Sequence, residues 1–342
     1  MTTRFMILSL TQAALLAGSV SKAQFAPREP VAVYPKSESF MVLEAYSGKV
    51  LMAQNSTRKQ PVASLNKIAA AAVAFDWLSA SGGDIAGITM RVPVSAVSLG
   101  GPNPMNLKPG ENIGMRDALY AMMLSSDNHA ALTVADHVGR QLLASRAKRG
   151  EPITEFVGEM NRLAKGLGMK HTRFRTPHGL ENEKTRAYST AADMARLSVY
   201  AMRINPLSFM VRQKSRRISV EGFSDTRSYT ARNTNQLLGT LGVLGIKTGT
   251  TRLAGPCLAT SVGRDPIVIE KLDGSKGVIP RRLIVVVLNS GDRFGRTRSL
   301  IAQSWQRYDH WVSGGRLVQS ERRELIKVPN PIADKRQLFL QP

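Results

Sequence analysis

The chain has 342 residues, of which 43% are hydrophobic and 21% are charged, and its formal net charge is +22. This composition supports a folded core, and the single cysteine excludes a disulfide framework, a cysteine-rich zinc site and a CxxC redox motif. The charge indicates an anionic partner and leaves open nucleic acid, a membrane surface or an acidic polymer.

The N-terminus has the order of a secretory signal peptide. Arg4 precedes an apolar stretch from Phe5 to Ala17, and small residues then lead to Ala23. We therefore predict that residues 1–23 are a signal peptide cleaved after Ala23, the alternative being a buried or anchoring N-terminal helix. The apolar stretch is shorter than the roughly 20 residues of a spanning helix. Export places the protein in the periplasm or cell envelope and argues against nucleic acid as the partner.

The remaining chain is predicted to be an extended lead-in at 24–38, a domain at 39–313 and a short basic tail at 314–342. Strands at 40–43 and 50–53 form a hairpin, a buried helix follows at 65–78, and residues 98–114 are rich in glycine and proline and form loops. Further helices are expected at 116–124, 128–138, 152–167, 190–202 and 294–312. Further strands are expected at 216–221, 227–232, 243–248, 256–262, 266–270 and 282–288.

This order predicts an α/β or α+β fold. Strands from both ends of the domain form one sheet, helices flank it, and a helical lobe is inserted between the two sets of strands. The sequence shows no internal repeat of 20–50 residues.

Ser64 and Lys67 stand three positions apart at the start of the buried helix, so their side chains are expected on one face, one turn apart. A serine hydroxyl is a weak nucleophile until a base takes its proton, and a lysine whose pKa is lowered by burial can be that base. The pattern alone is weak, because a capping serine followed by a surface lysine gives the same spacing.

Two further segments support the interpretation of Ser64 and Lys67 as a nucleophile and its base. Ser126-Asp127-Asn128 lies between two helical patterns and offers a hydroxyl and an amide on a short loop. Lys247-Thr248-Gly249-Thr250 follows a strand; Lys247 can pair with a carboxylate there, and Gly249 lets a substrate lie close to the backbone. Each segment alone is also explained by a capping turn or an edge strand. The combination of S-x-x-K, S-D-N and K-T-G in this order is a signature of β-lactamases and penicillin-binding proteins.

With these motifs the sequence resembles the D-alanyl-D-alanine carboxypeptidases, the low-molecular-mass penicillin-binding proteins of the S11 serine peptidase family. The resemblance covers roughly residues 39–312 and implies a β-lactamase/transpeptidase-like fold with an antiparallel sheet. It also rests on matching stretches at 121–131, 160–169, 176–180, 188–194 and 233–235.

The resemblance implies a role for each motif residue. Ser64 attacks the carbonyl of the D-Ala-D-Ala bond and Lys67 accepts its proton. Ser126 passes a proton to the leaving amine and Asn128 holds the substrate amide. Lys247 and Thr248 bind the terminal carboxylate, and the backbone N–H groups of Ser64 and Thr250 form the oxyanion hole. The implied partners are peptidoglycan stem peptides, and β-lactam antibiotics are implied as covalent inhibitors.

Three rival activities remain open. The tail is too short for a second β-rich domain and an amphipathic anchor. This keeps open the alternative that the protein belongs to the D,D-endopeptidase branch, which cuts cross-links. Asp127 stands where many relatives have glycine, as in class A β-lactamases, but no Glu-x-x-Leu-Asn stretch supplies their deacylating glutamate. A non-catalytic cell-wall-binding protein is disfavoured by the intact Ser64, Lys67 and Lys247.

No metal site or cofactor is expected, because the five histidines show no metal-ligand spacing and there is no phosphate-binding loop. His178 is expected to fix a turn, and Cys257 to lie in the core. Basic clusters at 146–149, 212–217 and 281–282 form solvated surface or attract anionic peptidoglycan or lipid headgroups weakly and in a salt-sensitive manner.

Overall fold

The computed structural model describes residues 38–180, 187–270 and 273–329. The predicted signal peptide at 1–23 and all but the last residue of the lead-in lie outside these residues. So does the end of the predicted tail.

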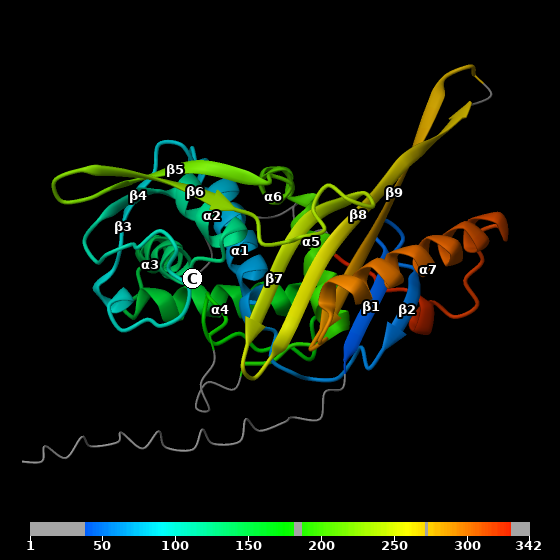
Figure 1. Ribbon diagram of the computed structural model, residues 1–342, viewed down its shortest axis with the longest axis horizontal. Helices are drawn as coiled ribbons and strands as arrows, with labels where there is room; N and C mark the ends of the chain where they lie inside the picture. Colours follow the sequence, from blue (N-terminus) through cyan, green and yellow to red (C-terminus); the bar gives the residue numbers. More distant parts are fainter. Residues whose placement is uncertain (1–37, 181–186, 271–272, 330–342) are drawn as a thin grey trace, which may run out of the picture. The chain divides into compact units, whose positions relative to one another are not determined.

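The main sheet has five antiparallel strands in the order β2-β1-β9-β8-β7, drawn in blue, gold and yellow in Figure 1. Its strands are β1 (Ser39–Glu44), β2 (Val50–Gln54), β7 (Val243–Thr251), β8 (Gly255–Glu270) and β9 (Lys276–Leu288). β1 pairs with the last part of β9, from Leu283 to Leu288. The prediction that both ends of the domain form one antiparallel sheet is therefore confirmed.

The two faces of this sheet are covered by different helices, because side chains of a strand alternate between its faces. Val285 and Val287 of β9 pack with Leu300 and Trp305 of α7 (Arg293–Ser313). The neighbouring Ile284 and Val286 belong to the larger core, which contains the helical lobe.

The inserted lobe supplies most of the remaining helices and a small second sheet. Its helices are α1 (Asn66–Ser81), α2 (Met115–Leu124), α3 (Asn128–Ser145), α4 (Pro152–Gly166), α5 (Ala191–Arg203) and α6 (Asn205–Val211), with single 3-10 turns at η1 (Ala63–Leu65) and η2 (Val94–Ala96). The second sheet joins β3 (Thr89–Arg91), β4 (Asn112–Gly114), β5 (Ser215–Glu221) and β6 (Thr226–Arg232). The four consecutive alanines Ala69–Ala72 of α1 are fully buried, so neighbouring helices can approach it closely.

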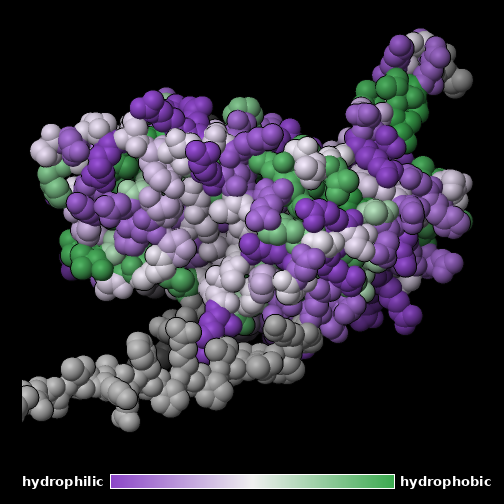
Figure 2. All heavy atoms as spheres, in the orientation of Figure 1, coloured by the Kyte–Doolittle hydropathy of each residue, from purple (hydrophilic) through white to green (hydrophobic). Residues whose placement is uncertain are grey.

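Two predicted strands, 256–262 and 266–270, are one strand in the structure. β8 continues through a bulge between Arg264 and Ile267, and β9 begins at Lys276 instead of residue 282. The sequence showed two separate strand-like runs on either side of residues 263–265, and the bulge lies at this interval. The two long strands extend beyond the sheet as a hairpin that carries a hydrophobic band, green in Figure 2.

The chain beyond residue 313 packs against the domain as far as the structure describes it. Leu325 bridges to Lys49, Glu324 of the short helix α8 (Glu321–Glu324) forms an ion pair with Lys49, and Ile326 is buried in the main core. The domain boundary at 313 stays a prediction. No helix in the described ranges is long and apolar enough to cross a membrane.

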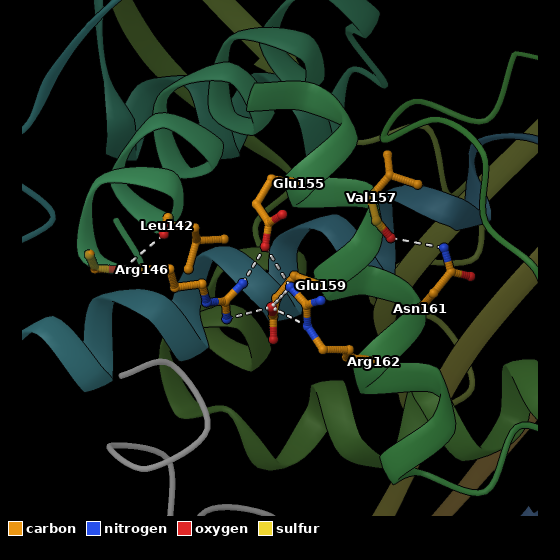
Figure 3. A network of polar contacts seen from close by, with 8 residues as sticks. Leu142, Arg146, Glu155, Val157, Glu159, Asn161 and Arg162 are labelled. Atoms are coloured by element: carbon orange, nitrogen blue, oxygen red, sulfur yellow. Dashed lines mark hydrogen bonds and ion pairs between the residues drawn. The ribbon is translucent and has the colours of Figure 1, made fainter. Parts of the chain in front are cut away.

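One predicted surface cation is buried. Arg146 belongs to the basic cluster at 146–149, yet its side chain is only 3% exposed and lies between α3 and α4 (Figure 3). It donates to Glu159 at 2.9 Å and also bonds to Glu155, and Arg162 bonds to the same two carboxylates. The expectation that Arg146 faces solvent is wrong, because two glutamates one turn apart on α4 draw it inward.

Candidate active site

Ser64 and Lys67 meet at the start of α1. Ser64 lies in the 3-10 turn η1, two residues before the first residue of α1, and Lys67 lies in the first turn of α1. The Nζ atom of Lys67 is 3.0 Å from the Oγ atom of Ser64. The expected proximity of these two side chains is therefore present.

Lys67 is fully buried and held by acceptors from three segments. Besides Ser64, its Nζ atom donates to Oδ1 of Asn128 at 2.7 Å and to the backbone carbonyl of His178 at 2.8 Å. Burial lowers the pKa of Lys67 well below its usual value, nearby Lys247 lowers it further, and Asp127 partly opposes both. This shift favours the neutral amine of Lys67 relative to an exposed lysine.

The second motif lies between α2 and α3. Ser126 is half-buried and adopts a left-handed backbone conformation (φ 63°) that turns the chain sharply. Asp127 caps α3 by accepting from the backbone N–H of Ala130 at 2.9 Å, and its other oxygen accepts from Met105 N–H at 3.3 Å. Asp127 therefore fixes the loop, so that Asn128 begins α3 facing Lys67.

The third motif lies on the edge strand β7. Lys247 is 1% exposed, and its Nζ atom donates to the carbonyl of Thr248 at 3.1 Å. Burial, with a contribution from the Arg293 charge, lowers the pKa of Lys247 to about 7. The hydroxyls of Thr248 and Thr234 are 2.6 Å apart.

Gly249 brings β7 directly against the segment that carries Ser64. A Cβ atom at this position would lie 2.9 Å from the backbone nitrogen of Ser64 and 3.2 Å from the carbonyl oxygen of Val62. The sequence suggested that this glycine makes room for substrate. The structure adds that it makes room for the chain itself, since any side chain would push β7 away from Ser64.

Sequence reasoning missed two contributors. Arg293, the first residue of α7, donates to the Gly249 carbonyl at 2.9 Å and to the Thr250 hydroxyl at 2.8 Å. The His178 carbonyl completes the surroundings of Lys67, while its Nδ1 atom accepts from Leu180 N–H at 3.0 Å, which confirms the expected turn. Burial lowers the pKa of His178 to about 3, with Lys67 and His129 adding to the shift, so its ring is neutral. No local sequence signal marks Arg293, since only the fold brings it to β7.

The other candidates for chemistry considered in the described part of the chain are metal-ligating side chains and the cysteine. No group of three or more His, Cys, Asp or Glu residues there could hold a metal ion. Cys257 is buried in β8, and its thiol lies near the carbonyls of Ala254 and Gly255.

Comparison with known proteins identifies the family. The family described as D-alanyl-D-alanine carboxypeptidase matches residues 24–270. The chain belongs to this family. D-alanyl-D-alanine carboxypeptidase DacC of Escherichia coli is 32% identical over 263 residues, which are 72% of this chain and 60% of the relative. A D-alanyl-D-alanine endopeptidase of Pseudomonas aeruginosa is 30% identical over 75% of this chain and 78% of its own length.

Solved structures of similar fold agree with this family assignment. Penicillin-binding protein D2 of Listeria monocytogenes, in its ampicillin-bound form, superposes with a TM-score of 0.63 at 25% identity, covering 80% of this chain and 99% of that protein. The Streptomyces K15 DD-transpeptidase gives a TM-score of 0.65 at 23% identity, covering 78% and 96%. The α/β fold with an antiparallel sheet and an inserted helical lobe is thus the fold of these enzymes. The chain spans 60% and 54% of the lengths of its Escherichia coli and Bacillus subtilis carboxypeptidase relatives.

Proposed function

We propose that this protein is a serine-type D-Ala-D-Ala carboxypeptidase that removes the terminal D-alanine from peptidoglycan stem pentapeptides. The observation that carries the proposal is the buried Lys67, whose amine lies 3.0 Å from the Ser64 hydroxyl and whose pKa is lowered by burial. A buried amine with a lowered pKa, at hydrogen-bond distance from the hydroxyl, is suited to act as the base for a serine nucleophile.

The hydrogen bonds of Lys67 support a specific proton path. A neutral amine has two N–H groups and one lone pair, and Asn128 Oδ1 and the His178 carbonyl accept hydrogen bonds but cannot donate them. Those two acceptors take the two N–H groups, which leaves the lone pair for the Ser64 O–H. Lys67 is thereby oriented to take the Ser64 proton as Oγ attacks.

The reaction then follows in two balanced steps. Ser64 Oγ forms an ester with the penultimate D-alanine, the C–N bond breaks, and Ser126 passes the proton from Lys67 to the leaving amine of the terminal D-alanine. Water next attacks the ester, Lys67 takes one of its protons, and Ser64 leaves with a proton restored. The Ser64 and Thr250 N–H groups stabilise the oxyanion in both steps. The close packing of Gly249 against Ser64 supports this pairing.

Recognition of the substrate falls to charged and polar groups on either side of Ser64. Lys247 and Thr248 bind the terminal carboxylate, Asn128 holds the substrate amide, and Gly249 leaves the strand backbone open. Arg293 adds a second positive group near Lys247 through its bonds to Gly249 and Thr250. β-Lactams, which present a carboxylate and a strained amide, acylate the same Ser64. No cofactor takes part.

A second candidate is D,D-endopeptidase activity on peptidoglycan cross-links. The Pseudomonas aeruginosa relative carries that name and matches 75% of this chain. Both activities use the same acyl-enzyme and differ in the leaving group. We place the protein in the periplasm or cell envelope, where the stem peptides are, with export by the N-terminal 23 residues.

An assay with purified muropeptides as substrates distinguishes these activities. Digestion followed by mass analysis is expected to show loss of one D-alanine from pentapeptides. Splitting of cross-linked dimers in its place supports the endopeptidase, and rapid turnover of penicillin with neither peptide product supports a β-lactamase. Labelled penicillin is expected to attach to the wild-type protein, and persistent labelling of Ser64→Ala would remove Ser64 as the nucleophile.

A further inference from the structure

Residues 100–105, here called the 100–105 loop, contact the first residue of α3. The backbone N–H of Asn128 donates to the carbonyl of Pro102 at 2.9 Å. The side-chain nitrogen Nδ2 of Asn128 donates to the carbonyl of Gly100 at 3.3 Å. The loop therefore holds both the backbone and the side chain of Asn128.

These contacts select one orientation of the Asn128 amide. The amide oxygen can only accept hydrogen bonds, and the amide nitrogen can only donate its two N–H groups. Lys67 donates to Oδ1 at 2.7 Å, while the Gly100 carbonyl accepts from Nδ2. A reversed amide would place two donors against each other at Lys67 and two acceptors against each other at Gly100. Among the described residues, Gly100 takes one N–H of Nδ2, so the second is available to the substrate amide that Asn128 is proposed to hold.

Gly101 lies at the closest approach between this loop and the Asn128 side chain. A Cβ atom on Gly101 would lie 2.5 Å from Nδ2 of Asn128 and 3.1 Å from the end of the Leu180 side chain. The backbone of Gly101 has a φ of +80°, which residues with a side chain rarely adopt. A Cβ atom on the neighbouring Gly100 would meet nothing within 4 Å. Glycine at position 101 therefore lets the loop reach Asn128 without displacing its amide.

Asp127 joins the same loop to α3. One carboxylate oxygen accepts from the backbone N–H of Ala130 at 2.9 Å and caps the helix, and the other accepts from the backbone N–H of Met105 at 3.3 Å. The Asp127 side chain is fully buried. A carboxylate accepts at both oxygens, whereas an asparagine amide accepts at one oxygen and would turn its NH2 group toward the second N–H. Asp127 thus does more than cap a helix, because it also ties the loop to the residue that precedes Asn128.

The chain that follows the 100–105 loop holds it from the other side. Asn103 bonds twice to the backbone of Leu107, with its Nδ2 atom 3.1 Å from the carbonyl and its Oδ1 atom 2.9 Å from the N–H. Further along, the buried Glu111 forms an ion pair with Arg227 of β6 at 2.6 Å. Because the loop has anchors on both sides, it can set the position of Asn128.

We propose that Gly101 and Asp127 are positioning residues of the active site. Together they hold the 100–105 loop against Asn128, so that its amide keeps the oxygen on Lys67 and one N–H free for the substrate. Both residues act through Asn128. The inference rests on the proposed function and adds to it the part of the chain that orients this amide.

Acylation of the full chain by labelled penicillin tests the proposal. Stopped-flow measurements at several penicillin concentrations give the dissociation constant of the first complex and the maximal acylation rate separately. Gly101→Ala is expected to raise the dissociation constant and to lower the maximal rate by about 10- to 100-fold, because Asn128 orients both the substrate amide and Lys67. Each rate is taken at the pH where that variant is fastest, so a change of charge near Lys67 does not enter the comparison.

A double-mutant cycle with Asn128→Ala separates positioning from a general effect on the fold. Without the Asn128 amide, the methyl group introduced by Gly101→Ala no longer meets Nδ2. Gly101→Ala is therefore expected to change the acylation rate of the Asn128→Ala protein by less than about twofold. A residue that acts only on the stability of the loop would lower both rates by the same factor.

Asp127→Asn tests the second positioning residue. An asparagine keeps an acceptor for the Ala130 N–H, so α3 stays capped, but it loses the hydrogen bond to Met105. The maximal acylation rate is expected to fall by about tenfold when Asn128 is present. In the Asn128→Ala protein the same substitution is expected to change the rate by less than about twofold.

Gly82→Ala is the matched control for backbone strain. Gly82 follows the last residue of α1 with a φ of +67°, and a Cβ atom there would meet nothing within 4 Å. This variant carries the strain of Gly101→Ala without the contact to an active-site side chain. Its acylation rate is expected to equal that of the wild type, and thermal denaturation checks that every variant is folded.

Three results would overturn the proposal. Wild-type rates in both Gly101→Ala and Asp127→Asn would show that neither residue positions Asn128. Equal losses of rate with and without the Asn128 side chain would show an effect on the fold, and an equal loss in Gly82→Ala would show that strain alone is the cause. If Gly101→Ala does not fold, the cycle with Asp127→Asn decides. Absence of labelling of the wild type would refute the proposed enzyme, and this inference with it, whereas the three results above leave the proposed function intact.

Discussion

The Nζ atom of Lys67 and the Oδ1 atom of Asn128 lie 2.7 Å apart, although 61 residues separate them in the chain. This bond joins the first turn of α1 to the first residue of α3. The Asn128 amide is uncharged, so Lys67 gains a hydrogen-bond acceptor without gaining a counter-charge. That combination keeps the amine both oriented and able to lose its proton.

Asn128→Asp tests this relationship. A carboxylate beside Lys67 raises the pKa of the amine, so the lysine stays protonated at neutral pH and cannot accept the Ser64 proton. The maximal rate of acylation by labelled penicillin at pH 7 is expected to fall by about 10- to 100-fold and to recover as pH rises. Asn128→Ala is the control, because it removes the acceptor without adding charge. If both variants share one pH profile, the charge argument fails.

Gly249→Ala is expected to reduce acylation by about 100-fold, with the loss arising at Ser64. The added Cβ atom would meet the Ser64 nitrogen at 2.9 Å, so β7 must shift away from the nucleophile and the oxyanion N–H groups separate. Stopped-flow acylation measures the effect. Gly263→Ala on β8 is the control, since its Cβ atom meets only the end of the Leu244 side chain at 3.3 Å. Equal rates for the two variants would contradict the close-packing role.

Substrate affinity is expected to fall as pH rises through about 7. The pKa of Lys247 is lowered to about 7 by burial and by Arg293, so below this pH the lysine is a cation that attracts the substrate carboxylate, and above it the charge is lost. Measured kcat/KM for a D-Ala-D-Ala peptide is expected to decline on the alkaline side with an apparent pKa near this value. Arg293→Gln removes a nearby positive charge and is expected to move this alkaline decline of kcat/KM to higher pH, irrespective of its effect on the maximal value of kcat/KM. If the decline occurs at the same pH in this variant, the Arg293 charge does not lower the pKa of Lys247.

Loss of Arg146 is expected to destabilise the inserted lobe. Arg146→Ala leaves Glu155 and Glu159 with Arg162 as their remaining partner, and breaking such a buried ion pair costs about 3 kcal/mol. Chemical denaturation measures the free energy of unfolding. Arg149→Ala, three residues further along at an exposed position, is expected to change it by less than about 0.5 kcal/mol. A similar effect of both substitutions would mean that the buried network adds no stability.

Much of the fold could be predicted because its signals are local. The lengths and composition of apolar runs distinguished helices from strands, and glycine and proline marked the loops. These signals predicted the order of hairpin, helical lobe, strands and final helix, which the structure confirms. The errors occur where a local signal competes with a distant contact. The interval at 263–265 separated two predicted strands, yet pairing with β9 continues β8 through the bulge. The cluster at 146–149 suggested a charged surface, yet Glu155 and Glu159 draw Arg146 into the lobe.

The sequence by itself determined which residues are candidates for the chemistry. Ser64, Lys67, Ser126, Asn128 and Lys247 are recognisable because three short motifs occur in a fixed order, and hydroxyl, amine and amide groups define what each can do. Only the tertiary structure decided how reactive these groups are. The pKa of a lysine depends on the water it loses and the charges it meets, and for Lys67 these are set by Asn128, His178 and Lys247, all more than 60 residues away. Spacing places a lysine beside a serine, but burial in the assembled fold lowers the pKa of that lysine.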